Sequence, residues 1–294
     1  MLISAVELLK KSVNLYTNNF VVILKYLLLT LIPTLIAVLV MWIPTIFGDT
    51  FSSILIKFWW LFTAMGIFTF LLVALLGLWF SFTLMRVIKK LYHRETLSPL
   101  LITTKETEKV VWKGIGTSLL VGVYTVAPFV VGAILLILNR LAVILPFGIL
   151  TPMSSAVVLA LGGILAVYGS IHAIIFSLKL FPATYETVLA EKPTHESIKS
   201  AFALTQNRWW LILGRLLLTA AAVWFVYLVL SLILSLVLDS LLKIFGIVGG
   251  GTILIYNILM QALSLLVTPV AFATAIILYE ELKKLGPARI EQKT

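Results

Sequence analysis

The sequence predicts an all-α, polytopic membrane protein with six transmembrane helices, and three observations carry this prediction. Hydrophobic residues make up 61% of the chain and charged residues 12%, against roughly 45–50% and about 25% in soluble domains. Several apolar runs reach the ~20 residues that a helix needs to cross a bilayer. Lys and Arg gather on alternate connections between these runs, as the positive-inside rule describes. This composition excludes a water-soluble fold.

The six predicted spans follow one another in a single membrane domain, residues 1–294. They cover approximately residues 20–47, 58–87, 112–138, 155–181, 209–238 and 252–279. Spans one, three and five are each preceded by a polar, amphipathic segment. We expect these three segments to form helices that lie in the membrane interface.

The first amphipathic helix is predicted from Ser4 to Asn19. Ser4 and Glu7 have the spacing of a capping box, in which a hydroxyl and a carboxylate satisfy each other's backbone amides. Apolar residues then recur every three or four positions, and Lys10 and Lys11 lie off this stripe. The stripe consists of Leu2, Val6, Leu9, Val13, Tyr16 and Phe20. The pattern is typical of an interfacial helix, and the frayed start of the first span is the alternative.

Prolines and helix-start signals define the elements that follow. Pro33 predicts a kink in the first span, because proline removes one backbone hydrogen bond. The Ser98-Pro99 pair and the Thr103-x-x-Glu106 pattern are helix-start signals. Residues 105–113 should therefore form a second polar, helical prelude to the third span.

The second half of the chain has a similar order of elements. Residues 139–152 are too few to span and too apolar for an ordinary loop, so we expect them in the outer interface. Span four should end at Pro182. Pro193-Thr194 supplies a break and a cap before the third amphipathic helix. The tail after Tyr279 is polar and predicted to be partly disordered.

The distribution of Lys and Arg predicts the orientation of the chain. Lys25 and Arg215, which lie deeper in spans one and five, are left aside. Seventeen of the other basic residues then lie on the side of the N-terminus, and three lie on the opposite loops, Lys57, Arg140 and Lys243. This asymmetry predicts a multi-pass protein of the cytoplasmic (plasma) membrane with both termini in the cytoplasm. Since the charge follows every cytoplasmic boundary, membrane lipids are the expected partners and nucleic acid is not.

One stretch of the sequence occurs twice. Residues 7–30 align without a gap with residues 196–219, and ten of the 24 aligned positions are identical. The matches that an abundance of leucine does not explain are Glu7/Glu196, Lys10/Lys199, Asn18/Asn207 and Thr30/Thr219. Each copy changes from a polar segment into a membrane-length apolar run. Whether residues 98–113 are a shortened third copy stays open.

Three basic residues are candidates for binding lipid headgroups. Lys25 and Arg215 lie just inside spans one and five, one position apart in the alignment of the repeat. A charge at the bilayer centre costs at least ~2.5–3.5 kcal/mol, but long side chains near a span's end reach the interface. The two residues either extend to the interface or form a shared site for an anion or a lipid phosphate. Arg208, at the polar-to-aromatic boundary before Trp209, is the third candidate.

Polar residues inside the spans are few. His172 in span four has no neighbouring acid, which favours an interhelical hydrogen bond over a metal site or a proton relay. Asn257 and Gln261 lie one turn apart in span six and suggest either interhelical contacts or the lining of a cavity. Small residues recur every four positions in spans three and four, which predicts close packing of these faces. They are Gly114, Ser118 and Gly122, and Gly162, Ala166 and Ser170.

Several kinds of chemistry have no residues to support them. The chain has no Cys, which excludes disulfides, thiolate metal sites and Cys nucleophiles. The predicted cores of the spans contain no Asp or Glu, which proton- or cation-coupled transporters usually need. No HExxH, Gly-x-Ser-x-Gly or paired acidic cluster occurs. We therefore expect neither an enzyme nor a bound cofactor or metal.

The segment from Glu196 to Trp210, ESIKSAFALTQNRWW, directly precedes an apolar span and has its counterpart near the N-terminus. This arrangement, over nearly the whole chain, resembles an uncharacterised family of prokaryotic six-helix integral membrane proteins. That family includes the membrane domain fused to some glycerophosphodiester phosphodiesterases. The resemblance implies a six-span fold of helical hairpins, each introduced by an interfacial helix, with no settled function. Because this sequence has no soluble phosphodiesterase domain, that activity does not carry over.

Two hypotheses about function follow. In the first, a non-enzymatic module binds lipids, or protein partners in the membrane or envelope, at its cytoplasmic face. In the second, the chain is a transporter of a small solute or a lipid built on a parallel internal repeat, since both copies enter the membrane from the same side. A cavity at mid-membrane lined by His172, Asn257 and Gln261 would favour transport.

Overall fold

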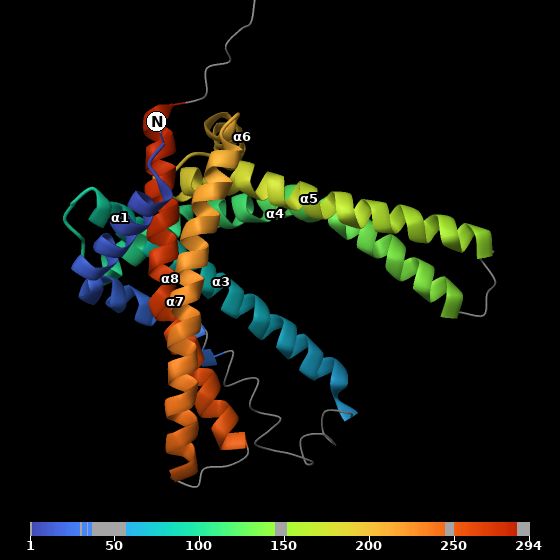
Figure 1. Cartoon of the computed structure of the whole chain (residues 1–294), viewed down its shortest axis with the longest axis horizontal. Coiled ribbons are helices and arrows are strands. Elements are labelled where there is room, and N and C mark those ends of the chain that lie inside the picture. The colour runs from blue at the N-terminus through green and yellow to red at the C-terminus, as the bar shows by residue number, and fades with distance from the viewer. Residues whose placement is uncertain are drawn as a thin grey trace, which may run out of the picture. The chain divides into compact units, whose positions relative to one another are not determined.

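The computed structural model describes residues 2–29, 31–33, 35–36, 57–144, 152–244 and 250–286, and nearly all of them are helical (Figure 1). The helices are α1 (Ala5–Asn18), α3 (Trp59–Tyr92), α4 (Leu100–Ile144), α5 (Pro152–Ala190), α6 (Thr194–Thr205), α7 (Trp209–Ile244) and α8 (Gly250–Leu285). Residues 20–29 and 31–33 are helical as well, and none of these described residues forms a strand. The all-α prediction is confirmed.

Among the residues that the structure describes, five helices are long and apolar enough to cross a membrane. These candidate spans are Thr63–Tyr92, Ile102–Leu138, Ala156–Ala190, Trp209–Ile244 and Ile255–Leu285. A sixth is reached if Ala5–Asn18 and Phe20–Pro33, which meet at 83°, count together as one broken span. Residues 30, 34 and 37–47 of the predicted first span lie outside the described residues. The chain has the helices of a multi-pass membrane protein.

The segment before the third span is not a separate helix. Helix α4 begins at Leu100 and continues without a break to Ile144, and no proline separates the polar start from the apolar run. The Ser98-Pro99 signal is therefore correct. Thr103 is not a cap, since its hydroxyl donates backward to the Ser98 carbonyl at 3.2 Å. Residues 145–151, the middle of the predicted outer segment, lie outside the described residues.

Two helices continue past the predicted ends of their spans. Helix α5 passes through Pro182 and ends at Ala190. Its last turns are held by packing, since Ala183 and Val188 are completely buried. Helix α8 continues past Tyr279 to Leu285, and Leu282 in that extension is completely buried. Tertiary burial thus extends both helices beyond the ends that proline and charge predict.

The chain divides into two compact units, which are described separately. Unit 1 comprises Met1–Val111 and Gly214–Glu281, and unit 2 comprises Trp112–Leu213 and Leu282–Thr294. Figure 1 shows α7 and α8 side by side in unit 1, and α4 and α5 side by side in unit 2. In both units the fully buried side chains gather at the charged ends of the helices. They include Phe82, Leu84, Ile88, Ile276 and Tyr279 in unit 1, and Leu180, Val188, Ala201 and Ile212 in unit 2.

Within unit 1, helix α1 packs against the other helices through a face that differs from its apolar stripe. Leu8 and Ser12 are completely buried, and the Thr274 hydroxyl of α8 donates to Ser12 Oγ at 3.1 Å. The stripe residue Val6, in contrast, is 79% exposed. The Ser4 cap is confirmed, because Ser4 Oγ accepts a hydrogen bond from the Glu7 amide at 3.2 Å. Packing and capping together hold α1 in place and leave its stripe on another face.

Small residues join α4 and α5 in unit 2, although not all at the predicted positions. A Cβ added at Gly132 of α4 would lie 2.6 Å from the Ala166 nitrogen, and one at Gly162 would lie 2.9 Å from Leu136. One at Gly169 would overlap the backbone of Phe129. The predicted face of α5 is therefore correct in part. Gly122 of α4 has nothing within 4 Å of its added Cβ, so this position of the predicted α4 face makes no close contact.

Candidate lipid-binding groove

The stripe of α1 forms one wall of an apolar groove in unit 1, which we call the α1 groove. Its volume is about 430 Å³. Helix α1 and the residue after the Asn19 turn supply one wall, and α7 and α8 supply the others. The lining residues are Leu9, Val13, Tyr16, Thr17, Phe20, Ala222, Val223, Val226, Leu230, Leu263, Leu266, Val267 and Val270. Thr17 and Tyr16 carry the only polar side-chain atoms among them.

Two sets of contacts fix α1 beside the groove. The first is the contact between the buried face of α1, which contains Leu8 and Ser12, and helix α8. The second is Arg215 of α7, whose guanidinium donates to the carbonyls of Leu2 and Ile3, at 3.0 Å for Leu2. Both of these N-terminal residues are buried. The segment before α1 is therefore tied to α7, which places the α1 wall of the groove opposite the α7 wall.

The walls of the groove are open to an apolar occupant. Val13, Phe20 and Val226 line it and are between 38% and 52% exposed, and Tyr16 meets Phe20 edge-on with ring centroids 5.5 Å apart. Apolar walls of this kind favour hydrocarbon over water as the occupant, by about 0.8 kcal/mol for each methylene group kept from water. The acyl chain of a lipid matches this lining.

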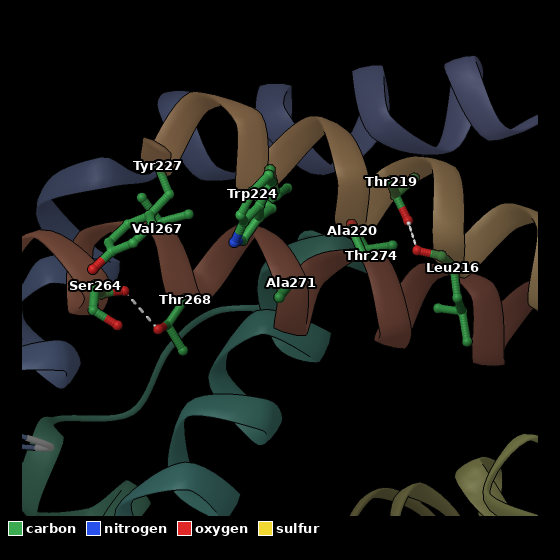
Figure 2. Close-up of a pocket in the computed structure, with 11 residues that line it drawn as sticks. Leu216, Thr219, Ala220, Trp224, Tyr227, Ser264, Val267, Thr268, Ala271 and Thr274 are labelled. Atoms are coloured by element: carbon green, nitrogen blue, oxygen red, sulfur yellow. Dashed lines mark hydrogen bonds between the residues drawn. The ribbon is translucent and has the colours of Figure 1, made fainter. Parts of the chain in front are cut away.

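A second cavity lies on the other side of the α7–α8 pair and is lined in part by hydroxyls (Figure 2). Its volume is about 450 Å³, and Val223 and Val267 line both cavities. Figure 2 shows the ring of Trp224 between the two helices. The other lining residues are Leu216, Thr219, Ala220, Tyr227, Ser264, Thr268, Ala271 and Thr274. We call it the hydroxyl-lined cavity.

Part of the polarity of this second cavity is already used within the helices. The Thr268 hydroxyl donates to the Ser264 carbonyl at 2.7 Å, and the Thr219 hydroxyl donates to the Arg215 carbonyl at 2.8 Å. Such bonds to the preceding turn satisfy a hydroxyl without a ligand. Fewer hydroxyl donors are therefore available to a solute than the composition of the lining suggests.

The three predicted headgroup residues have different surroundings. Arg215 binds the N-terminal carbonyls described above. In unit 2, Arg208 Nη1 donates to the Gly286 carbonyl beyond the end of α8 at 2.9 Å. Lys25 is exposed and forms no ion pair with a described residue. Two of the three thus help to hold the fold through backbone carbonyls, and the structure does not bring Lys25 and Arg215 to a common partner among the described residues.

The predicted intramembrane polar residues do not share a site. His172 Nε2 lies 3.1 Å from the Tyr124 carbonyl of α4, and its ring stacks on Phe176 with centroids 3.9 Å apart. Asn257 and Gln261 are exposed on α8. None of the three lines the α1 groove or the hydroxyl-lined cavity.

Sequence reasoning found the α1 wall of the groove and missed the other two walls. The stripe residues Leu9, Val13, Tyr16 and Phe20 were identified by their spacing. Helices α7 and α8 are apolar on all sides, as membrane helices are, so their composition contains no periodic signal that marks one face. The run Ala220-Ala221-Ala222 is the only local sign that a face of α7 leaves space.

Comparisons with known proteins add no family. The sequence matches no protein-family model, and comparisons with curated proteins and with solved structures give no significant match. The resemblance to the membrane domain of glycerophosphodiester phosphodiesterases has no support from them. Among the described residues, no three His, Cys, Asp or Glu side chains are grouped so that they could hold a metal ion.

Proposed function

We propose that the protein is a non-enzymatic, six-span protein of the cytoplasmic membrane that binds a lipid through the α1 groove. The carrying observation is that an amphipathic helix fixed to the protein by its other face turns its apolar stripe toward a groove of about 430 Å³. Both termini lie in the cytoplasm in this proposal. A lipid bound here has its headgroup near α1 and its acyl chain between α7 and α8.

The charges near the groove support a phospholipid as its occupant. Lys10 and Lys11 are exposed on α1. Lys11 Nζ lies 3.2 Å from Oε1 of Glu7, which is one helical turn earlier. Anionic lipids of the cytoplasmic leaflet attract each basic residue near the surface by about 1 kcal/mol. Helix α1 thus combines exposed basic residues, which suit a phospholipid headgroup, with an apolar groove lining, which suits an acyl chain.

Three consecutive alanines of α7 provide the test. Ala222 lines the α1 groove, Ala220 lines the hydroxyl-lined cavity, and Ala221 lines neither. Ala222→Trp should fill the groove and reduce the number of lipids that native mass spectrometry detects on the protein purified in mild detergent. Ala221→Trp is the matched control and should retain the wild-type number. Equal lipid retention by all three proteins would disprove the groove as the site.

Transport of a small solute or lipid is the second candidate, and the hydroxyl-lined cavity is the observation that favours it. The repeat adds support, since aligned residues of its two copies are buried in their own units. These pairs are Leu8/Ser197, Ser12/Ala201 and Ile23/Ile212. Under this proposal Ala220→Trp should block uptake into proteoliposomes, and Ala222→Trp should not. Lipid retention and uptake therefore separate the two functions.

A further inference from the structure

A small cavity in unit 2 joins a lysine, two carboxamides and an indole at the boundary between α6 and α7. Its volume is about 360 Å³, and it is lined by Lys179, Phe202, Gln206, Asn207 and Trp209. We call it the Lys179 pocket. It contains one positive charge and no acidic residue. None of its residues lines the α1 groove, so the two sites use separate parts of the chain.

Aromatic contacts prepare the position of the lysine. Lys179 Nζ lies 5.5 Å from the ring centroid of Phe176, and this ring meets Phe202 of α6 edge-on at 5.9 Å. On its other side, Phe176 stacks on His172. A cation held over an aromatic face gains roughly 0.5–1 kcal/mol at an exposed site and loses part of its freedom before a ligand arrives.

The backbone around the pocket is also fixed. The Thr205 hydroxyl donates to the Lys179 carbonyl at 3.0 Å, which ties the end of α6 to α5. Asn207 adopts the left-handed conformation with φ of 59°, which asparagine tolerates better than most residues. This turn brings Gln206, Asn207 and Trp209 to one cavity between two helices.

The polar groups of the pocket remain available for a ligand. Lys179 Nζ makes no ion pair with any described residue, and the amides of Gln206 and Asn207 form no side-chain hydrogen bond within the described part of the chain. An ammonium binds phosphate as a point charge, and each carboxamide adds two N–H donors. One positive charge with several neutral donors fits a phosphate group of charge about −1, as in a phosphodiester. Phosphatidylcholine carries the same phosphodiester, but Lys179 repels its choline cation, so the pocket favours a phospholipid whose headgroup has no cation.

We infer that the Lys179 pocket binds the phosphodiester headgroup of an anionic phospholipid of the cytoplasmic leaflet. A lipid is favoured over a free phosphate because Trp209 lines the pocket and stacks on Trp210 with centroids 4.0 Å apart. Paired indoles at the end of a span are typical of the depth at which headgroups lie. The inference rests on the lipid-binding function and adds the headgroup class and a second site to it.

The test compares lipid selectivity in nanodiscs of equimolar phosphatidylglycerol and phosphatidylcholine. Native mass spectrometry of the protein released from the nanodiscs gives the ratio of bound phosphatidylglycerol to bound phosphatidylcholine. Lys179→Gln should lower this ratio by roughly fivefold, the factor expected for one basic residue at the headgroup level. Gln206→Glu should lower it as well by repelling the phosphate. Lys179→Arg keeps the charge and should preserve the ratio.

Lys199→Gln is the matched control, because Lys199 is exposed on α6 in the same unit and does not line the pocket. An unchanged ratio in Lys179→Gln, or an equal fall in Lys199→Gln, would overturn the inference in favour of diffuse attraction. Displacement of phosphatidylglycerol by millimolar inorganic phosphate would overturn the choice of a lipid. Failure of the α1 groove is seen separately, as an unchanged total of bound lipids in Ala222→Trp.

Discussion

Threonine hydroxyls hold the polar ends of the helices in unit 2 together. Thr117 of α4 lies 2.9 Å from the Thr187 hydroxyl of α5 and donates to Thr194 of α6 at 3.1 Å. Thr117 and Thr187 are completely buried. Three helices are thus joined through one side chain, at the end where the core of the unit lies.

Thr117→Val tests this contact. The substitution removes the hydroxyl and keeps the shape, and it should destabilise the protein by about 1 kcal/mol. The cost stays small because Thr187 and Thr194 retain bonds to the carbonyls of Ala183 and Lys113. Thermal unfolding in detergent, followed by intrinsic fluorescence, measures the effect. The control is Thr125→Val, whose hydroxyl binds only its own helix; an equal loss there would show that the contacts between helices are unimportant.

Single polar residues were predictable where their partner is local in the sequence. The Ser4 cap is such a case, because the amide it binds lies three residues away. Thr103 and Thr194 were given the same role and do not have it. The Thr194 hydroxyl meets Thr117 and the Lys113 carbonyl of another helix, and spacing along the chain contains no information about that partner.

Among the elements, the α4–α5 pair depends on glycines that admit the neighbouring backbone. Gly169→Leu should separate the two helices and cost about 1–3 kcal/mol, since an added Cβ overlaps Phe129 and backbone cannot move away cheaply. Gly163→Leu is the matched control, because its added Cβ meets nothing within 4 Å. The measurement is the thermal midpoint in detergent. A midpoint that falls equally in both variants would contradict close packing at Gly169.

The helices themselves were predicted more securely than the faces through which they meet. Long apolar runs identify α3, α4, α5, α7 and α8, because a bilayer requires such runs of any spanning helix. The face of α1 that packs against the protein was not predicted, because Ser12 counts as polar and yet is buried through its bond with Thr274. The close contact of α4 with α5 at Gly132 was not predicted, whereas the predicted Gly122 has nothing within 4 Å of its added Cβ.

For the whole molecule, the number of spans decides on which side α1 lies. The chain has no Cys, so a single introduced cysteine reports its own side when labelled with an impermeant maleimide. Lys57, Lys105, Lys243 and Lys10 are all exposed. In either topology, Lys105→Cys should label on one side and Lys57→Cys and Lys243→Cys on the other. If the chain has six spans, Lys10→Cys should label on the same side of the membrane as Lys105→Cys. Labelling of Lys10→Cys on the side of Lys57→Cys would establish five spans.

The side of α1 matters because the proposed lipid site lies beside it. The core of each unit lies at the charged ends of its helices. The N-terminal half of α3, in contrast, is widely exposed, as at Phe68 and Phe70. Within each unit, the specific contacts are therefore concentrated at the charged ends of the helices.

The most direct test of the proposed function locates a bound acyl chain by crosslinking. A phospholipid with a photoreactive group on its acyl chain is incorporated in nanodiscs and irradiated after extraction into mild detergent, so that only retained lipid reacts. Peptide mapping then identifies the modified residues. Adducts at Val13 of α1 and Val226 of α7 are the predicted result. Adducts confined to Leu216 and Trp224 of the hydroxyl-lined cavity, or none after extraction, would contradict a lipid in the α1 groove.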